Sequence, residues 1–289
     1  MNVQLTLDVA LLAFPPTAST TPAIVIVTFN WAIWYNRVCY FATLATPPPL
    51  LTAAQHLAEF ALDRTRLPGI KPVSTSPAIA RLAKDPPRAA IFAFTDGSAA
   101  PNPGPTGAGL WVSLPDTPAG PGVEVEISAA LGLANNNVGE MAALELAVRT
   151  AAGALRALPF LAPPDVLFFT DSMLSLGHIV HGWTFDADLA LGYRARSGFH
   201  SLTQTARTRL YWVRGHSGVP GNVRADTAAG AASKLSATLA PHAPAPLPTL
   251  TLCYHGGGRV SPAELAARPD LVSLLALLPA HSVVQPDSG

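Results

Sequence analysis

The alternation of apolar and polar residues between residues 90 and 236 predicts strands first and helices afterwards. IFAFTD is an apolar strand that ends at Asp96. Two further strands are predicted by GAGLWVSLP and by VEVEISAAL, which a Pro/Gly turn joins at 118–122. The stretch VEVEIS alternates strictly, as a half-exposed antiparallel strand does. These three strands follow one another closely and therefore predict an antiparallel meander.

Helices and strands alternate after this meander. NNNVGEMAALELAVRTAAGAL predicts a long helix, which Asn137 can cap, with Glu140 three residues later as in a capping box. DVLFFTDS is apolar enough for a central strand that ends at Asp171. Helical segments at 173–182 and about 189–205, a fifth strand in RLYWVRG and a closing helix in GNVRADTAAGAASKL complete the pattern. This order predicts an α/β fold, with a mixed five-stranded sheet and flanking helices.

Proline clusters near residues 87 and 240 bracket the α/β pattern and predict linkers. The chain then divides into an N-terminal apolar helical segment with a Pro-rich linker, the α/β domain, and a Pro-rich linker with a short C-terminal helical tail, at 1–89, 90–236 and 237–289. Polar residues interrupt the apolar segment 23–45, so we interpret it as a buried helix rather than a membrane span. The N-terminus also lacks the early positive charge of a secretory signal.

The overall composition excludes several classes of protein. Hydrophobic residues make up 49% of the chain, which is ample for a core, and 18 basic residues balance 18 acidic ones. The chain therefore has no overall positive charge of the kind that would indicate a nucleic-acid partner. Cys39 and Cys253 lie far apart and predict neither a disulfide framework nor a zinc cluster. We expect a reducing intracellular compartment, nuclear or cytoplasmic.

Four carboxylates occupy positions where they could converge. Asp96 and Asp171 each end an apolar strand, and Glu140 and Asp226 lie in the first turns of two helices. Crowded carboxylates call for a bound cation, and oxygen ligands select Mg²⁺ or Mn²⁺. Two such ions can activate a water and stabilise the leaving oxygen in phosphodiester hydrolysis. Each acid alone has an ordinary structural explanation, in a turn or near a helix N-terminus, whereas the four together favour a metal site.

One histidine lies near the predicted acidic site. His216 is flanked by glycines beyond the fifth strand, ten positions before Asp226. A single histidine is usually a surface or core residue, but one on such a loop can reach the cleft and shuttle protons.

Four motifs in succession resemble those of the type 1 ribonuclease H family over roughly half the chain: FTDGSAAPNPGPTGAG, NNNVGEMAALELA, FFTDS and WVRGHSGVPGNVRAD. The resemblance implies a ribonuclease H-like fold and an endonuclease that cuts the RNA strand of RNA/DNA hybrids with two Mg²⁺ ions, leaving 5′-phosphate and 3′-hydroxyl ends. It implies that Asp96 bridges both metals, that Glu140, Asp171 and Asp226 complete the ligand set, and that His216 assists proton transfer or product release.

The same resemblance implies contacts to the substrate. Gly97, Ser98 and Asn102 would lie near the hybrid, and Asn136 and Asn137 would contact its backbone or minor groove. Reading 2′-hydroxyls on one strand only is the physical basis for choosing a hybrid over a plain duplex.

Several residues depart from the family pattern. Met173 stands where the family often has Gln, and Val223 stands where an acid is frequent. Residues 91–236 carry nine basic and eleven acidic side chains, although five arginines gather in a stretch without acids and could follow phosphates: Arg194, Arg196, Arg207, Arg209 and Arg214. An alternative is therefore a hybrid-binding or scaffolding module with little independent activity.

The N-terminal stretch FNWAIWYNRVCYFATL resembles the helix that precedes this domain in reverse transcriptases of non-LTR retrotransposons. That resemblance implies an upstream reverse transcriptase domain as a partner, on which the activity of the nuclease domain could depend.

Overall fold

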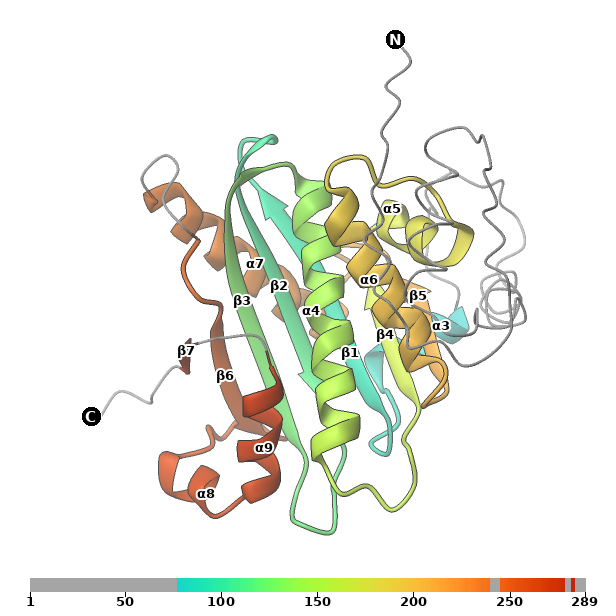
Figure 1. The fold of residues 1–289 in the computed structure, drawn as a ribbon, viewed down its shortest axis with the longest axis vertical. Coiled ribbons are helices and arrows are strands. Elements are labelled where there is room, and N and C mark those ends of the chain that lie inside the picture. The colour runs from blue at the N-terminus through green and yellow to red at the C-terminus, as the bar shows by residue number, and fades with distance from the viewer. Residues whose placement is uncertain (1–76, 240–244, 279–281, 284–289) are drawn as a thin grey trace, which may run out of the picture.

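A mixed sheet forms the centre of the computed structural model, which describes residues 77–239, 245–278 and 282–283. In the described residues its order is β5-β4-β1-β2-β3-β6-β7 (Figure 1). The strands are β1 (Ile91–Ala99), β2 (Gly104–Ser113), β3 (Val123–Ala134), β4 (Val166–Thr170), β5 (Thr208–Trp212), β6 (Thr249–Tyr254) and β7 (Ser282–Val283). All five predicted strands are present, and β6 and β7 extend the sheet beyond them.

The pairing of the strands confirms the predicted meander. Strands β1, β2 and β3 are antiparallel neighbours, while β4 runs parallel to β1 and β5 runs parallel to β4. Strand β1 does not end at Asp96 as predicted, because Gly97 and Ser98 continue to pair with β2. The sequence suggested an end there because Gly-Ser breaks the apolar run, but β2 supplies backbone partners regardless of side chain.

Helices cover both faces of the sheet (Figure 1). They are α3 (Pro77–Lys84), α4 (Asn136–Ala157), α5 (Met173–Leu176), a short π-helical turn η2 (Gly177–His181), α6 (Leu189–Leu202), α7 (Pro220–Thr238), α8 (Pro262–Ala266) and α9 (Pro269–Leu277). Helices α4 and α6 pack together on one face, and α7 crosses β1, β2 and β3 on the other. Helix α3 forms within the predicted N-terminal linker, because Ile79, Leu82 and Ala83 pack at helical spacing against the buried cluster that includes Phe92 and Phe94.

Two apolar cores lie on the two faces. The larger one packs α4 and α6 against the sheet, and the smaller one stacks Phe94 on Phe169 with ring centroids 4.5 Å apart. Helix α7 approaches β2 so closely that a β-carbon at Gly109 would lie only 2.1 Å from the carbonyl oxygen of Ala225. The glycines of β2 and the alanines of α7 thus let the helix that carries Asp226 lie directly on the sheet.

The N-terminus of α4 differs from the prediction. Asn135, not Asn137, caps the helix, and its side chain accepts a hydrogen bond from the backbone N–H of Val138 at 3.1 Å. Three consecutive asparagines are chemically equivalent caps, and the helix begins at the first position that leaves the β3 strand. Glu140 therefore lies inside the helix rather than in a capping box, with its side chain available to face the sheet.

The segment after residue 247 contains more than the predicted linker and helical tail. Strand β6 pairs antiparallel with β3, and α9 packs on α4. A buried pair holds this segment in place, since Arg268 donates to both oxygens of Asp270 at 2.9 and 2.8 Å and to the carbonyl oxygen of Pro121 at 3.0 Å. TLTLCY alternates as a strand should, with Leu250 and Leu252 buried.

Several sequence-based predictions lie outside the described residues: the apolar segment 23–45, Cys39 and the stretch that resembles a reverse transcriptase helix. The division into three segments at 89/90 and 236/237 stays a prediction. Among the helices that the structure does describe, none is both long and apolar enough to cross a bilayer.

Candidate active site

Two of the four predicted acids are brought together by the central strands. Thr95 of β1 pairs with Thr170 of β4 in parallel register, so Asp96 and Asp171 follow at the same edge of the sheet. Asp96 is 5% exposed and accepts a hydrogen bond on Oδ1 from the backbone N–H of Gly97 at 2.8 Å. This register is what brings the two carboxylates close together.

Glu140 joins them because α4 approaches β1 backbone to backbone. A β-carbon at Gly97 would lie 2.2 Å from the nitrogen of Glu140 and 2.6 Å from the carbonyl carbon of Gly139. Only a glycine at position 97 leaves room for this contact. The Glu140 side chain is 4% exposed, and its Oε1 accepts a hydrogen bond from Nδ2 of Asn136 at 3.3 Å.

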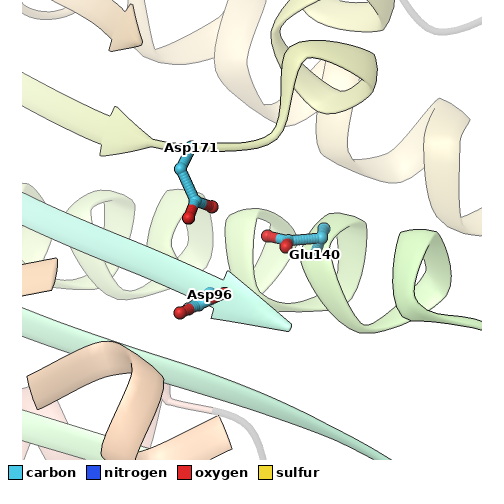
Figure 2. A group of neighbouring side chains, drawn as sticks. All are labelled: Asp96, Glu140 and Asp171. Carbon is cyan, nitrogen blue, oxygen red and sulfur yellow. The ribbon is translucent and has the colours of Figure 1, made fainter. Parts of the chain in front are cut away.

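The described part of the chain thereby holds Asp96, Glu140 and Asp171 in one group, with one oxygen of each within 4.8 Å of the others. Figure 2 shows the three side chains gathered in one place, with Asp96 on β1, Glu140 on α4 and Asp171 just after β4. The group lies in a cleft of about 820 Å³.

Asp226 and His216 line the same cleft but stand apart from the three-carboxylate group. Asp226 lies near the start of α7, and its Oδ2 is 3.8 Å from Nδ1 of His216. The His216 side chain is 81% exposed, and its backbone has a left-handed φ of 51°. Such a conformation is uncommon for a non-glycine residue and is found more often at functional sites.

Burial and mutual repulsion raise the pKa values of two acids of the group, Asp96 and Glu140. Burial, followed by the negative charges of Asp171 and Asp226, raises the pKa of Asp96 to about 8. Burial, followed by the charges of Asp96 and Asp171, raises the pKa of Glu140 well above its usual value. A cation that replaced these protons would remove both the repulsion and the cost of burial.

The residues of this group fit a divalent metal ion. All three supply carboxylate oxygens, the donors that Mg²⁺ and Mn²⁺ prefer. Glu140 Oε2 is buried and has no hydrogen-bond partner among the described residues, which is costly unless a ligand contacts it. The donor set, its spacing and this oxygen together describe a site for a hard cation.

The stability of the metal-free protein should depend on pH through Asp96. The folded protein keeps this proton up to a pH of about 8, whereas the unfolded chain releases it near 3.8, so the free energy of unfolding falls as pH rises between these values. Through this one group, the free energy of unfolding falls by at most about 1.4 kcal/mol per pH unit.

Urea unfolding of wild type and Asp96→Asn in EDTA between pH 5 and 8 measures this effect. His178 and His181 act in the opposite direction, because burial lowers their pKa values, but they do so equally in both proteins. The variant should gain stability relative to wild type as pH rises. A constant difference between the two proteins would contradict the assignment of the proton to Asp96.

Most of the predicted substrate contacts line the cleft, namely Gly97, Ser98, Asn136 and Asn137. Asn102 is not among the lining residues; instead its Oδ1 accepts a hydrogen bond from the backbone N–H of Asn136 at 3.0 Å. Asn102 is therefore the one predicted substrate contact that does not line the cleft.

The five arginines do not form one surface along the cleft. Arg214 lines the cleft. In contrast, Nε of Arg194 lies 3.7 Å from Oε1 of Glu145, and Nη1 of Arg207 lies 3.6 Å from Oδ2 of Asp165. Their nearness in sequence was therefore a poor guide, because Arg194 on α6 and Arg207 just before β5 lie beside different carboxylates.

Sequence analysis overlooked Gly139 and Gly215, which shape the site through close approach. A β-carbon at Gly139 would lie 2.8 Å from the carbonyl oxygen of Gly107, and one at Gly215 would lie 2.1 Å from Oδ2 of Asp171. A glycine inside a predicted helix is unfavourable by about 1 kcal/mol, which is the signal that could have marked Gly139.

Replacing Gly97 by Ala should both destabilise the fold and displace Glu140. The new β-carbon would overlap backbone atoms of α4, which can yield only if the helix shifts. We expect a loss of about 1–3 kcal/mol in urea unfolding, typical of an overpacked site. Gly153→Ala in α4 is the control, since its β-carbon would meet nothing closer than 3.5 Å and should leave stability equal or higher. Equal stabilities for the two variants would refute the close-approach account.

Comparison with known proteins identifies a family that the chain matches. Residues 88–234 match the family model described as RNase H. Ribonuclease H of Verminephrobacter eiseniae (strain EF01-2) is 32% identical over 152 residues, covering 47% of this chain and 85% of that protein. Ribonuclease H of Rhizobium meliloti (strain 1021) is 31% identical over 145 residues, with the same two coverages. The structure of RNase H1 from the archaeon Halobacterium salinarum NRC-1 is 26% identical, with a TM-score of 0.38, covering 50% of this chain and 97% of that one.

Proposed function

Because the chain belongs to the ribonuclease H family of enzymes, we propose that it is a metal-dependent endonuclease that hydrolyses the RNA strand of RNA/DNA hybrids. The single observation that carries this proposal is the group of Asp96, Glu140 and Asp171 in an open cleft. The group has the donors and the spacing for a hard cation, and phosphodiester hydrolysis is chemistry that such cations serve.

We propose two divalent ions, Mg²⁺ or Mn²⁺. Asp96, Glu140 and Asp171 would hold them, and Asp226 would contribute from the wall of the cleft. When bound, such ions lower the pKa of an attacking water and stabilise the charge on the leaving oxygen. Products with 5′-phosphate and 3′-hydroxyl ends follow if the leaving oxygen is the 3′ oxygen.

His216 is proposed to move a proton at this site or to assist product release. Its ring nitrogen faces the carboxylate of Asp226, and its side chain is mostly exposed, so it can turn between the acid and a bound substrate. A histidine near neutral pH can carry a proton in either direction.

Gly97, Ser98, Asn136 and Asn137 are proposed to position the hybrid. A glycine leaves its backbone open to a close ligand, and asparagine amides can both donate to and accept from sugars and base edges. Selection of the hybrid would arise from 2′-hydroxyls on one strand only. Asn102 would act indirectly, by orienting the backbone of Asn136.

A second candidate is a hybrid-binding module with little independent turnover, assisted by an upstream reverse transcriptase domain. The observation that favours it is the charge of residues 91–236, with nine basic and eleven acidic side chains. Binding to nucleic acid depends strongly on the number of phosphates that cations neutralise, so another domain would have to supply affinity.

A substrate panel separates these functions. The purified chain is incubated with labelled RNA/DNA hybrid, single-stranded RNA and double-stranded DNA, in Mg²⁺ or in EDTA. Cleavage of the RNA strand of the hybrid alone, lost in EDTA and restored by Mg²⁺, is expected. Binding of the hybrid without cleavage would favour the second candidate, and cleavage of all three substrates would overturn the proposed specificity.

A further inference from the structure

The last residue of β5 and the residues that follow it, 212–215, contact the residues around Asp171 at three points. The backbone N–H of Val213 donates to the carbonyl oxygen of Thr170 at 2.9 Å. The indole Nε1–H of Trp212 donates to the carbonyl oxygen of Asp171, also at 2.9 Å. The backbone of Gly215 lies against the Asp171 carboxylate so closely that a β-carbon would come within 2.1 Å of Oδ2. Residues of this one segment therefore surround both the main chain and the side chain of Asp171.

The hydrogen bond from the Trp212 indole lies just beyond the last residue pair between β4 and β5. Thr170 and Trp212 form the last pair between β4 and β5, so Asp171 lies just beyond the ladder. Only Ser172 separates it from α5. Trp212 is 3% exposed, and its ring is fixed in the larger core, so its N–H is a rigid donor rather than a mobile one. The orientation of Asp171 therefore depends on a side chain from the neighbouring strand.

The other two acids of the group are held differently. Asp96 lies within β1, and Glu140 lies within α4, and the contact of Gly97 with the α4 backbone sets their separation. Asp171 is the member of this group that follows its strand instead of lying within an element. Its carboxylate would be the one that drifts when a local hydrogen bond is lost.

We propose that Trp212 is a positioning residue for Asp171: its indole N–H holds the Asp171 carbonyl and so keeps the carboxylate within reach of Asp96 and Glu140. This inference rests on the proposed metal-dependent function. Hydrogen-bond partners behind metal ligands commonly change metal affinity or activity by about 10–100-fold when they are removed.

Trp212→Phe tests the proposal, because it removes the N–H and keeps a buried aromatic ring. Trp111→Phe is the matched control. Trp111 is also buried, at 9% exposure, but its Nε1 has no hydrogen-bond partner among the described residues. Both variants lose similar ring volume, and only the first loses a bond to the site. Mg²⁺ binding is measured by isothermal titration calorimetry, together with the melting temperature, kcat and KM for the hybrid.

Trp212→Phe should bind Mg²⁺ about tenfold more weakly than wild type and need correspondingly more Mg²⁺ for half-maximal activity, with KM for the hybrid unchanged. Trp111→Phe should bind Mg²⁺ as wild type does. Equal Mg²⁺ affinity in the two variants would overturn the positioning role and leave Trp212 as a packing residue. A wild-type chain that neither binds Mg²⁺ nor cleaves the hybrid would instead overturn the proposed function, and this inference with it.

The indole resonances of the wild-type protein give an answer even if Trp212→Phe does not fold. In ¹H–¹⁵N spectra, the Trp212 N–H should exchange slowly with solvent and should shift on addition of Mg²⁺, because its acceptor adjoins a metal ligand. The Trp111 N–H, which serves as the internal control, should not shift. A Trp212 resonance unaffected by saturating Mg²⁺ would contradict the proposal.

Discussion

Replacing Asp96 by Asn should reduce cleavage of the hybrid by about a thousandfold or more. The substitution keeps the shape of the side chain but removes a charged oxygen from the centre of the group. A bound metal supplies several kcal/mol of transition-state stabilisation, and each 1.36 kcal/mol corresponds to a factor of ten in rate. Single-turnover cleavage of a labelled hybrid measures the loss.

The same variant should be more stable than wild type in the absence of metal at pH 8. A neutral amide at position 96 ends the repulsion from Asp171 and Asp226 and the cost of burying a charge. Asp186→Asn is the control, since Asp186 is exposed and does not line the cleft. Lost activity combined with lost stability would show misfolding instead, and wild-type activity in Asp96→Asn would rule out a catalytic role for the group.

Replacing Arg268 by Ala should cost about 3–5 kcal/mol of stability, because it leaves the Asp270 carboxylate buried without its partner. Asp270 and Arg268 are 8% exposed each, and the guanidinium also contacts the carbonyl oxygen of Pro121 in the turn between β2 and β3. The pair lowers the pKa of Asp270, chiefly through its hydrogen bonds to Arg268. Urea unfolding at pH 7 measures the loss.

A double variant, Arg268→Met with Asp270→Leu, separates the ion pair from the packing around it. Removing both charges leaves no buried ion without a partner, so the double variant should be much more stable than Arg268→Ala. If Arg268→Ala unfolds like wild type, the segment from β6 to α9 contributes little to the domain, and the predicted division at residue 237 is favoured.

The sequence was sufficient to predict the meander and the positions of Asp96 and Asp171 after apolar strands, for identifiable physical reasons. Alternation in VEVEIS and the apolar runs before Asp96 and Asp171 report directly on which faces are buried. The parallel pairing of Thr95 with Thr170 then places the residues that follow them, Asp96 and Asp171, side by side. Local pattern and topology agree in these strands, so the fold was predicted correctly.

Features that depend on contacts between distant segments could not be predicted in this way. Asn135 caps α4 although Asn137 is chemically equal, because the path of the chain leaving β3 selects the position. Asp226 remains outside the three-carboxylate group, because its position is set by the packing of α7 on β2. Strand β6 alternates as a strand should, but it is short and follows a Pro-rich stretch, so only its pairing with β3 identifies it.

The most direct test is to locate the bound metal by NMR. Mn²⁺ is titrated into isotope-labelled protein, and the backbone resonances that broaden first are assigned. The predicted result is that resonances at and beside Asp96, Glu140 and Asp171 broaden at the lowest Mn²⁺ concentrations and recover when excess Mg²⁺ is added. Broadening that begins around other acids, such as Glu124 and Glu126 on β3, would contradict the assignment of the active site to this group.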